Sequence, residues 1–171
     1  DIMCAGAFSV SNDSDLKWVY FLDGLKDGDN NIAALIRCND MLRQTFADSE
    51  HYQNYSVIMK NELIFRKSGM VVGDKFFYDN YCTYQNTDFE TWRKQSFESN
   101  TWQLFPLEEI DTGERTFQAM TFSYPVRNYI QQEPEANAVV QFLLSKENLE
   151  QMFGQLLSRQ GGILIYDAED R

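Results

Sequence analysis

An aromatic cluster between Phe76 and Trp102 is the part of the sequence best suited to binding a small molecule. Tyrosine and tryptophan combine an apolar ring with a polar group, and an arginine can bind a carboxylate or a hydroxyl. This mixture is typical of pockets for small polar organic ligands. The ligand-binding residues that we predict are Tyr78, Tyr81, Trp92, Arg93 and Tyr124.

Within this set, Trp92 and Tyr78 are expected to form the pocket walls. Arg93 and Tyr124 are expected to supply polar contacts, and Tyr124 joins the cluster if its strand lies alongside. The alternative interpretation is an aromatic core with Arg93 at its rim.

Histidine and cysteine chemistry has little support in the sequence. His51 is the single histidine and lies in a polar link, whereas a triad or a multi-histidine metal site would need more than this residue. Cys4, Cys38 and Cys82 are widely spaced and contain no CxxC pair, which argues against a zinc site or a disulfide framework. We interpret them as buried small apolar residues.

Two carboxylate pairs, Glu108-Glu109 and Glu133/Glu135, lie on expected polar links. A glycosidase would need two such groups to face each other across a pocket, and we interpret both pairs as solvated surface. Gly-rich phosphate loops, GxSxG and HExxH are absent from the sequence. The sequence therefore predicts a protein that is not an enzyme, with no catalytic residue, metal or cofactor. A small carboxylate-dependent hydrolase remains the alternative.

Composition points to a globular domain that does not bind nucleic acid. The chain has 171 residues, 43% of them hydrophobic and 15% aromatic, and a net charge of −11. An acidic surface repels phosphate backbones. No run of 18 apolar residues occurs, and the first ten residues lack the basic region of a signal peptide. Because the chain starts at Asp1 rather than Met, we expect it to be a fragment.

The elements that position the cluster begin with two helices. Asp13 or Ser14 can cap a helix running to about Lys26, and Asp29 or Asn30 can cap a second one. The apolar face of the second helix is expected to contain Ile32, Leu35, Ile36, Met41, Leu42 and Phe46.

A sheet and further helices are expected after Tyr55. The ranges 55–60 and 63–67 read as a hairpin around a polar turn, and 74–82 reads as a short aromatic helix. Thr87-Asp-Phe-Glu90 reads as a capping box for a helix that carries Trp92. Strands are expected over 115–124, ended by Pro125, and over 138–144. Ser145 can cap an amphipathic helix, and a further strand is expected over 162–167.

This order of elements resembles a PAS-like sensor fold preceded by a helix. The residue pattern is similar to that of the Cache sensor domains of bacterial membrane receptors. It is most similar to the extracellular halves of Firmicutes regulators with an AraC-type DNA-binding domain and of related histidine kinases. The segments that carry the resemblance are Tyr55–Phe65, Phe77-Tyr78, Phe89–Lys94, Thr121–Val126, Ala138–Leu144 and Gly161–Asp167.

The resemblance implies a tandem Cache arrangement, α+β in class, with a PAS-like antiparallel sheet flanked by helices. Residues 1–50 would be an N-terminal helical arm, 51–145 the membrane-distal module, and 146–171 a connecting helix with the first strand of a membrane-proximal module. In the amino-acid-binding Cache pattern Arg precedes Trp and an Asp follows, whereas here Trp92 precedes Arg93.

The resemblance also implies a function. The chain would be a sensor at the extracellular face of the bacterial cell membrane, tethered by segments outside this sequence and acting in signal transduction, through an AraC-type regulator or a two-component histidine kinase. Its partners would be a small polar organic ligand (a sugar, amino acid or organic acid) and a second copy that dimerises through the N-terminal helices. The other alternative is a cytoplasmic PAS-type module that acts through protein contacts.

Overall fold

The computed structural model describes residues 10, 13–14, 16, 19, 28–46, 52–99, 101–126 and 136–154. The helices and strands within these residues are, in chain order, α3 (Gly28–Phe46), β1 (Asn54–Met59), β2 (Leu63–Arg66), β3 (Gly69–Val72), α4 (Asp74–Tyr81), β4 (Thr83–Tyr84), α5 (Phe89–Glu98), β5 (Gln103–Asp111), β6 (Thr116–Val126), β7 (Ala138–Ser145) and α6 (Lys146–Gly154).

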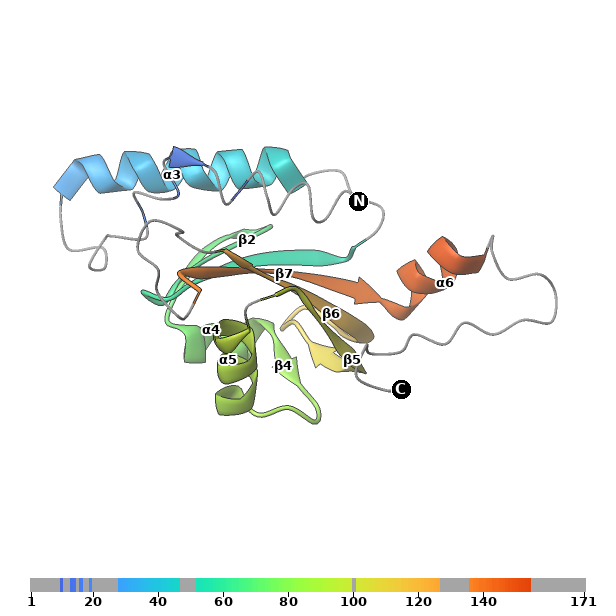
Figure 1. Ribbon diagram of the computed structural model, residues 1–171. Helices are drawn as coiled ribbons and strands as arrows, with labels where there is room; N and C mark the ends of the chain where they lie inside the picture. Colours follow the sequence, from blue (N-terminus) through green and yellow to red (C-terminus); the bar gives the residue numbers. More distant parts are fainter. Residues whose placement is uncertain are drawn as a thin grey trace.

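The strands form one antiparallel sheet of seven strands in the order β3-β2-β1-β7-β6-β5-β4 (Figure 1). The last strand in the chain, β7, lies in the middle and pairs with β1 on one side and β6 on the other. Every residue of β7 is buried because the sheet is covered on both faces there. The expected fold class is confirmed: α+β, with a PAS-like antiparallel sheet flanked by helices and preceded by a helical arm.

Helices lie on both faces of the sheet, with α3 on one side and α4 and α5 on the other (Figure 1). Side chains alternate along a strand, so neighbouring residues enter different cores. On β6, Phe122 and Val126 pack in the core under α3, whereas Ala119 packs in the core under α4 and α5. On β7, Phe142 and Val139 are divided in the same way. The fold therefore has two apolar layers that share one sheet.

The helix α3 differs from its prediction in which residues it buries. It begins at Gly28, just before the expected caps. Ile32 and Ile36 were expected in the core but are 55% and 51% exposed, so that part of the prediction is wrong. Ala34 and Cys38 are buried instead, because positions one helical turn apart along 34, 38 and 42 form the stripe that faces the sheet. The other buried residues of α3 are Leu35, Leu42 and Phe46, and Met41 is partly buried.

Most of the predicted elements after Tyr55 are confirmed: the β1–β2 hairpin, the helices α4 and α5, the strands β6 and β7, and the helix α6. The amide of Asn148 donates to the Ser145 hydroxyl at 3.1 Å, so Ser145 caps α6 as expected. Asp13 accepts from the amide of Leu16 at 2.8 Å, which is the cap expected for the first helix. The remainder of that helix lies outside the described residues.

Three strands were not predicted. The short edge strand β3 begins at Gly69 and is followed by Gly73, and β4 has only two residues. The strand β5 contains Pro106 and an irregularity in its pairing with β6 between Phe105 and Glu108. Pro125 does not end β6, which continues to Val126. It lies beyond the last pair that β6 makes with β5, so its missing N–H costs no hydrogen bond on that side.

The expected capping box at Thr87 is also wrong by one residue. Asp88 is the N-cap of α5, and its side chain accepts from the amide of Thr91 at 2.8 Å. The Thr87 hydroxyl donates instead to Glu108.

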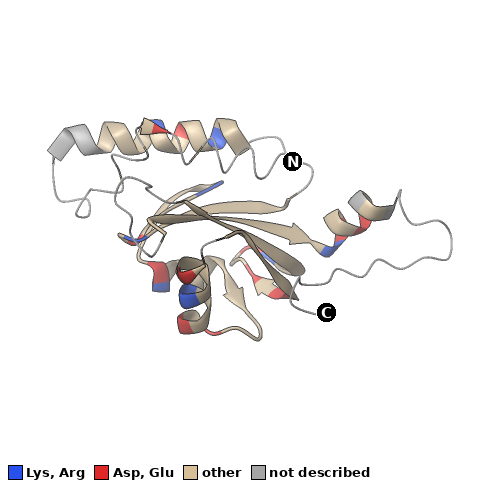
Figure 2. Cartoon of the chain, in the orientation of Figure 1, with Lys and Arg blue, Asp and Glu red and all other residues tan. Residues whose placement is uncertain are grey.

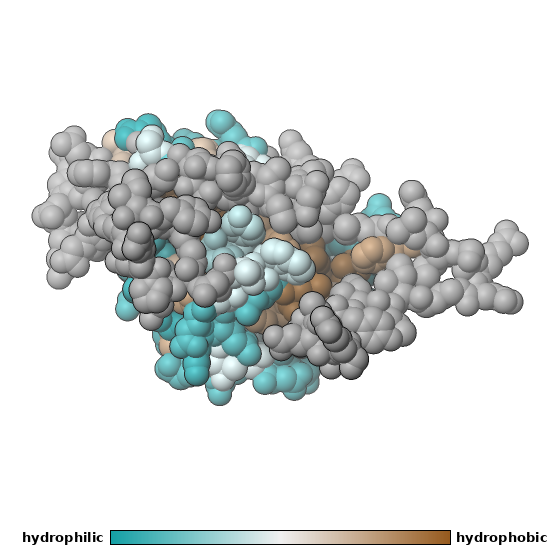
Figure 3. All heavy atoms as spheres, in the orientation of Figure 1, coloured by the Kyte–Doolittle hydropathy of each residue, from teal (hydrophilic) through white to brown (hydrophobic). Residues whose placement is uncertain are grey.

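Some predicted features lie outside the described residues: His51, Cys4, Glu133, Glu135 and the strand expected over 162–167. Figure 3 shows a hydrophobic area between the sheet and α6. Trp102, just before β5, stacks on Phe122 of β6 with ring centroids 5.8 Å apart. Trp102 is 57% exposed, so this stacked pair is open to solvent on the tryptophan side.

Candidate functional site

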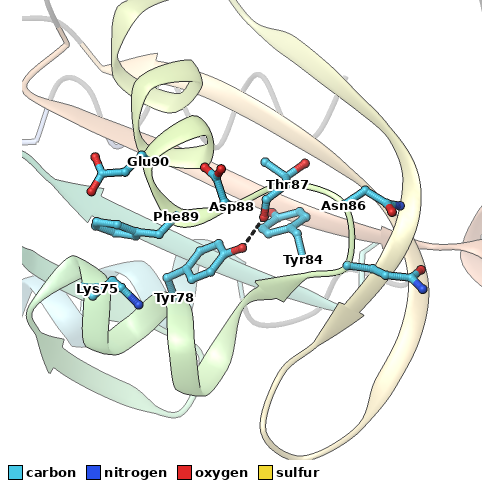
Figure 4. A pocket seen from close by; sticks show the side chains of 9 residues that line it. Lys75, Tyr78, Tyr84, Asn86, Thr87, Asp88, Phe89 and Glu90 are labelled. Carbon is cyan, nitrogen blue, oxygen red and sulfur yellow. Dashed lines mark hydrogen bonds between the residues drawn. The ribbon is translucent and has the colours of Figure 1, made fainter.

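An open cleft of about 680 Å³ lies where α4, β4 and the start of α5 meet. Its lining comes from one continuous part of the chain, between the first turn of α4 and the first turn of α5 (Figure 4). The residues that line it are Lys75, Tyr78, Tyr84, Gln85, Asn86, Thr87, Asp88, Phe89 and Glu90.

Three aromatic rings form the apolar part of the cleft. The ring of Tyr78 meets Phe89 edge to face at 5.7 Å and stacks against Tyr84 at 6.2 Å. Trp92 lies behind them, with its ring 5.4 Å from Tyr78 and 6.0 Å from Phe89. It is only 2% exposed, so it supports the wall rather than forming its surface. Tyr78 and Tyr84 are themselves only 5% exposed, so the half-buried Phe89 supplies most of the aromatic surface that a bound molecule could reach.

The hydroxyls of the two cleft tyrosines form hydrogen bonds that connect the elements around the cleft. The hydroxyl of Tyr78 donates to the carbonyl of Thr87, which ties α4 to the loop before α5 (Figure 4). Burial raises the pKa of Tyr78, so the phenol keeps its proton and remains a donor at neutral pH. The hydroxyl of Tyr84 lies 2.9 Å from that of Thr121 on β6, and burial raises its pKa well above the usual value.

A buried carboxylate, Glu108, holds the loop that forms one wall. Its two oxygens accept from the amide of Asn86 at 2.9 Å and from the hydroxyl of Thr87 at 3.0 Å. The prediction that Glu108 is solvated surface is therefore wrong, since only 7% of the residue is exposed. Its neighbour Glu109 is exposed, because adjacent residues of a strand point to opposite faces. The two carboxylates thus do not face each other across a pocket.

Charged groups surround the aromatic rings of the cleft. Lys75 lies 5.4 Å from the ring of Phe89 and also forms an ion pair with Asp79. The carboxylates of Asp88 and Glu90 lie on the other side of the rings (Figure 4). Two hydrogen bonds from Thr91 lower the pKa of Asp88, and the one from its backbone amide has the larger effect. This carboxylate is therefore ionised at neutral pH. The lining therefore contains one cation and two anions.

Arg93 is engaged elsewhere. Its Nε forms an ion pair with Asp74, the first residue of α4, and its guanidinium lies 5.4 Å from the ring of Phe97. Asp74 is buried and also accepts from the amide of Lys75 at 2.8 Å. The structure therefore gives Arg93 the aspartate partner that the sequence did not assign, and it places the pair outside the residues that line the cleft. Direct contact between Arg93 and a ligand stays a prediction.

The remaining two predicted residues do not line the cleft. Tyr81 is on α4, but the guanidinium of Arg66 lies over its ring at 3.9 Å. Tyr124 packs against the core under α3, on the opposite face of the sheet from Tyr78 and Trp92. The structure thus brings together four of the predicted residues around α4 and α5, and only Tyr78 lines the cleft.

Several residues of the cleft were missed by reading the sequence. Lys75 and the loop from Gln85 to Asp88 are polar, and nothing in their spacing separates them from ordinary surface. A usable signal was present at Glu108. It is two residues from Ile110, and residues two apart on a strand point to the same face, which is the buried one here. That pattern would have placed the carboxylate on the buried side.

The search of protein-family models finds no family that matches this chain, and the search of curated proteins finds no match either. The Cache resemblance therefore rests on the sequence pattern and on the fold class alone.

Within the described part of the chain, no helix is both long enough and apolar enough to cross a bilayer. The same residues contain no group of three or more His, Cys, Asp or Glu side chains placed to hold a metal ion. Cys38 and Cys82 are buried, as expected. Burial raises the pKa of Cys82 to about 12, which makes its thiol a poor nucleophile at neutral pH.

Proposed function

We propose that this chain is the extracytoplasmic ligand-sensing domain of a transmembrane signalling protein, such as an AraC-type regulator or a sensor histidine kinase. It binds a small polar molecule without transforming it, and it passes the binding event to the helical arm. The observation that carries the proposal is the cleft between α4 and α5, which combines aromatic walls with a polar rim on a PAS-like sheet. Pockets of this size and composition suit small polar organic ligands.

The charges of the lining narrow the ligand class. Lys75 can bind a carboxylate, whereas Asp88 and Glu90 can bind an ammonium group or hydroxyl groups. Because the anions outnumber the cation, dianionic acids are disfavoured. A zwitterionic amino acid or a sugar fits best, with a ring or aliphatic part against Phe89 and Tyr78.

The arm and the cleft lie on opposite faces of the sheet, so the signal must pass through the sheet. Tyr84 in the cleft reaches Thr121 on β6, and the next residue, Phe122, packs under α3. A ligand that orders the cleft can therefore bias the packing of α3. If α3 can adopt two positions, the ligand can shift the equilibrium between them only by the difference in its affinity for the two.

The alternative of a carboxylate-dependent hydrolase is weakened by the most obvious acidic pair. Glu108 is used to hold the loop, and Glu109 points to the other face of the strand. The alternative of a cytoplasmic interaction module does not require a cleft of about 680 Å³ with aromatic walls.

The test is a thermal-shift screen of the full chain against amino acids, sugars, organic acids and nucleosides. A ligand that binds only the native state raises the melting temperature in proportion to the logarithm of its concentration above Kd. We expect one chemical class to give a dose-dependent rise, with the compound recovered unchanged. Phe89→Ala and Lys75→Ala should each remove most of this rise, whereas Lys94→Ala, on the exposed side of α5, should retain it.

Two results would overturn the proposal. The first is consumption of a compound that binds, which would indicate an enzyme. The second is a response that Phe89→Ala and Lys75→Ala leave unchanged, which would place binding elsewhere.

A further inference from the structure

A second, open cavity lies between the exposed side of the arm helix α3 and the sheet, on the face of the sheet opposite to the cleft. It has a volume of about 450 Å³ and is lined by Asp40, Arg43, Gln44, Tyr55 and Lys67. The first three residues are on α3, Tyr55 is on β1, and Lys67 directly follows β2. Figure 2 shows blue segments on α3 and at the end of β2 beneath it. The cavity is thus built jointly by the arm and the sheet.

The charge of this cavity is opposite to that of the whole chain. Arg43 and Lys67 are cationic and Asp40 is anionic, whereas the chain carries a net charge of −11. Among the residues that the structure describes, neither Arg43 nor Lys67 forms an ion pair. Two cations from different elements that face one cavity attract an anion, and an arginine can bind a carboxylate or phosphate through two hydrogen bonds.

Tyr55 adds a hydrogen-bond donor without an acceptor. The residue is 1% exposed, and its hydroxyl has no hydrogen-bond partner among the described residues. Burial raises the pKa of Tyr55 to about 12, although the charge of Arg43 acts in the other direction. The phenol therefore keeps its proton at neutral pH and remains a donor. Buried polar groups are nearly always hydrogen-bonded, so an acceptor atom is expected beside this hydroxyl.

We propose that this cavity is a second ligand site, which takes a small anion with a carboxylate or phosphate group. One oxygen of the anion accepts from the hydroxyl of Tyr55, and the negative charge is balanced by Arg43 and Lys67. The amide of Gln44 can donate to a further oxygen. Because these residues belong to both the arm and the sheet, the bound anion holds α3 in the observed position. The site is separate from the cleft and does not depend on the function proposed for it.

The experiment consists of two titrations of the full chain, one with sodium acetate and one with inorganic phosphate, each monitored by amide NMR shifts. Chloride keeps the ionic strength constant, since screening would otherwise imitate weak binding. At least one of the two anions should bind saturably and shift the amides near residues 40–44, 55 and 67 more than those near 75–90. The titration that saturates identifies whether the site recognises a carboxylate or a phosphate group.

Variants then test the residues. Arg43→Gln and Lys67→Gln should each weaken binding about tenfold or more, and Tyr55→Phe should weaken it about fivefold. Lys94→Gln makes the same charge change on an exposed residue of α5 and should bind as the wild type does. Without an anion, Tyr55→Phe should melt at the same temperature or higher, because it removes a buried donor without a partner.

The proposal is overturned if neither anion saturates at millimolar concentration, or if Arg43→Gln and Lys67→Gln bind as tightly as the Lys94→Gln control. It is also overturned if the shifts follow residues 75–90, which would assign the anion to the cleft. Phe89→Ala changes the cleft alone, so loss of the proposed sensor function and loss of this site can be told apart.

Discussion

Arg93 of α5 and Asp74 of α4 form an ion pair that joins the two helices on one face of the sheet. The aspartate is 10% exposed at its side chain and the arginine 36%. Asp74 is also the first residue of α4, where a carboxylate is favoured by the helix dipole. The pair therefore fixes the relative position of the helices whose other residues line the cleft.

Removal of this ion pair is the first prediction. Arg93→Ala leaves the largely buried carboxylate of Asp74 without its cationic partner, although the amide of Lys75 still donates to it. We expect a loss of about 1–3 kcal/mol in the free energy of unfolding. Urea unfolding monitored by circular dichroism measures this loss. The double variant Asp74→Ala/Arg93→Ala should be less destabilised than the sum of the two single variants, because they share one interaction.

The control for this cycle is Lys94→Ala. Lys94 lies next to Arg93, is 70% exposed, and pairs with Glu98 only at 4.0 Å. Exposed pairs of this kind contribute about 0–1 kcal/mol. Equal losses for Arg93→Ala and Lys94→Ala would contradict the structural role of the Arg93–Asp74 pair.

A second prediction concerns the turn between β5 and β6. Gly113 has a φ of 75°, and a Cβ at this position would lie 2.2 Å from the carbonyl oxygen of Asn80 on α4. Gly113→Ala therefore combines backbone strain with a clash against backbone, and we expect it to cost at least about 2 kcal/mol. Gly69→Ala is the matched control: its φ is also positive, at 133°, but nothing lies within 4 Å of the added atom.

The difference between the two glycine variants measures the contact between the turn and α4. Gly69→Ala should show backbone strain alone and should melt at the higher temperature. If Gly113→Ala costs only about 1 kcal/mol in chemical denaturation, as expected for the left-handed φ alone, the turn does not rest on α4 as described.

A third prediction concerns alkaline pH and the buried thiol of Cys82. Burial raises its pKa from the ordinary 9.0 to about 12, so the unfolded chain loses this proton at a lower pH than the folded chain does. The folded state then binds more protons between these two values, and the stability falls as the pH rises through that range. Below about pH 9 this contribution is complete.

Comparison of the wild type with Cys82→Ala isolates this effect from other titrating groups. The cost of the substitution should shrink by about 1 kcal/mol between about pH 8 and about pH 10, at 1.36 kcal/mol per pH unit. Urea midpoints at the two pH values measure it. A cost that stays constant across this range would mean that the thiol is not shielded from water in the fold.

The sequence predicted the elements with a clear period and missed those whose pattern is interrupted. The strands β6 and β7 and the helix α6 have strong alternation or helical spacing. In β5, Pro106 has no backbone N–H for the strand pairing. The buried Glu108 breaks the usual rule that charged residues of a strand face water. The alternation of β5 could have placed this carboxylate on the buried side, but not its donors, Asn86 and Thr87, which are far from it in the sequence.

The position of Tyr124 shows what could have been predicted for the site. Phe117 and Phe122 are an odd number of residues apart, so a strand that contains both must bury both of its faces. Tyr124 shares a face with Phe122, and the structure places both under α3. That Tyr124 lies on the same sheet face as Phe122 could thus be predicted, because residues an even number apart on a strand share a face. The covering helix could not, because both faces of β6 are apolar and either set of helices could have packed there.

The last prediction concerns Glu108 and the loop that it holds beside the cleft. In Glu108→Ala, both acceptor oxygens are lost, so the amide of Asn86 and the hydroxyl of Thr87 lose their shared partner. We expect a loss of about 1–2 kcal/mol in stability and faster hydrogen exchange at the amide of Asn86. The neighbouring Glu109→Ala makes the same charge change on an exposed side chain and should leave that exchange rate unchanged, because only the backbone carbonyl of Glu109 contacts the loop, at 3.0 Å from the amide of Gln85. If both variants exchange at the wild-type rate, the carboxylate does not hold this wall of the cleft, and the loop must be ordered by its other bonds, from Tyr78 to Thr87 and from Gln85 to Glu109.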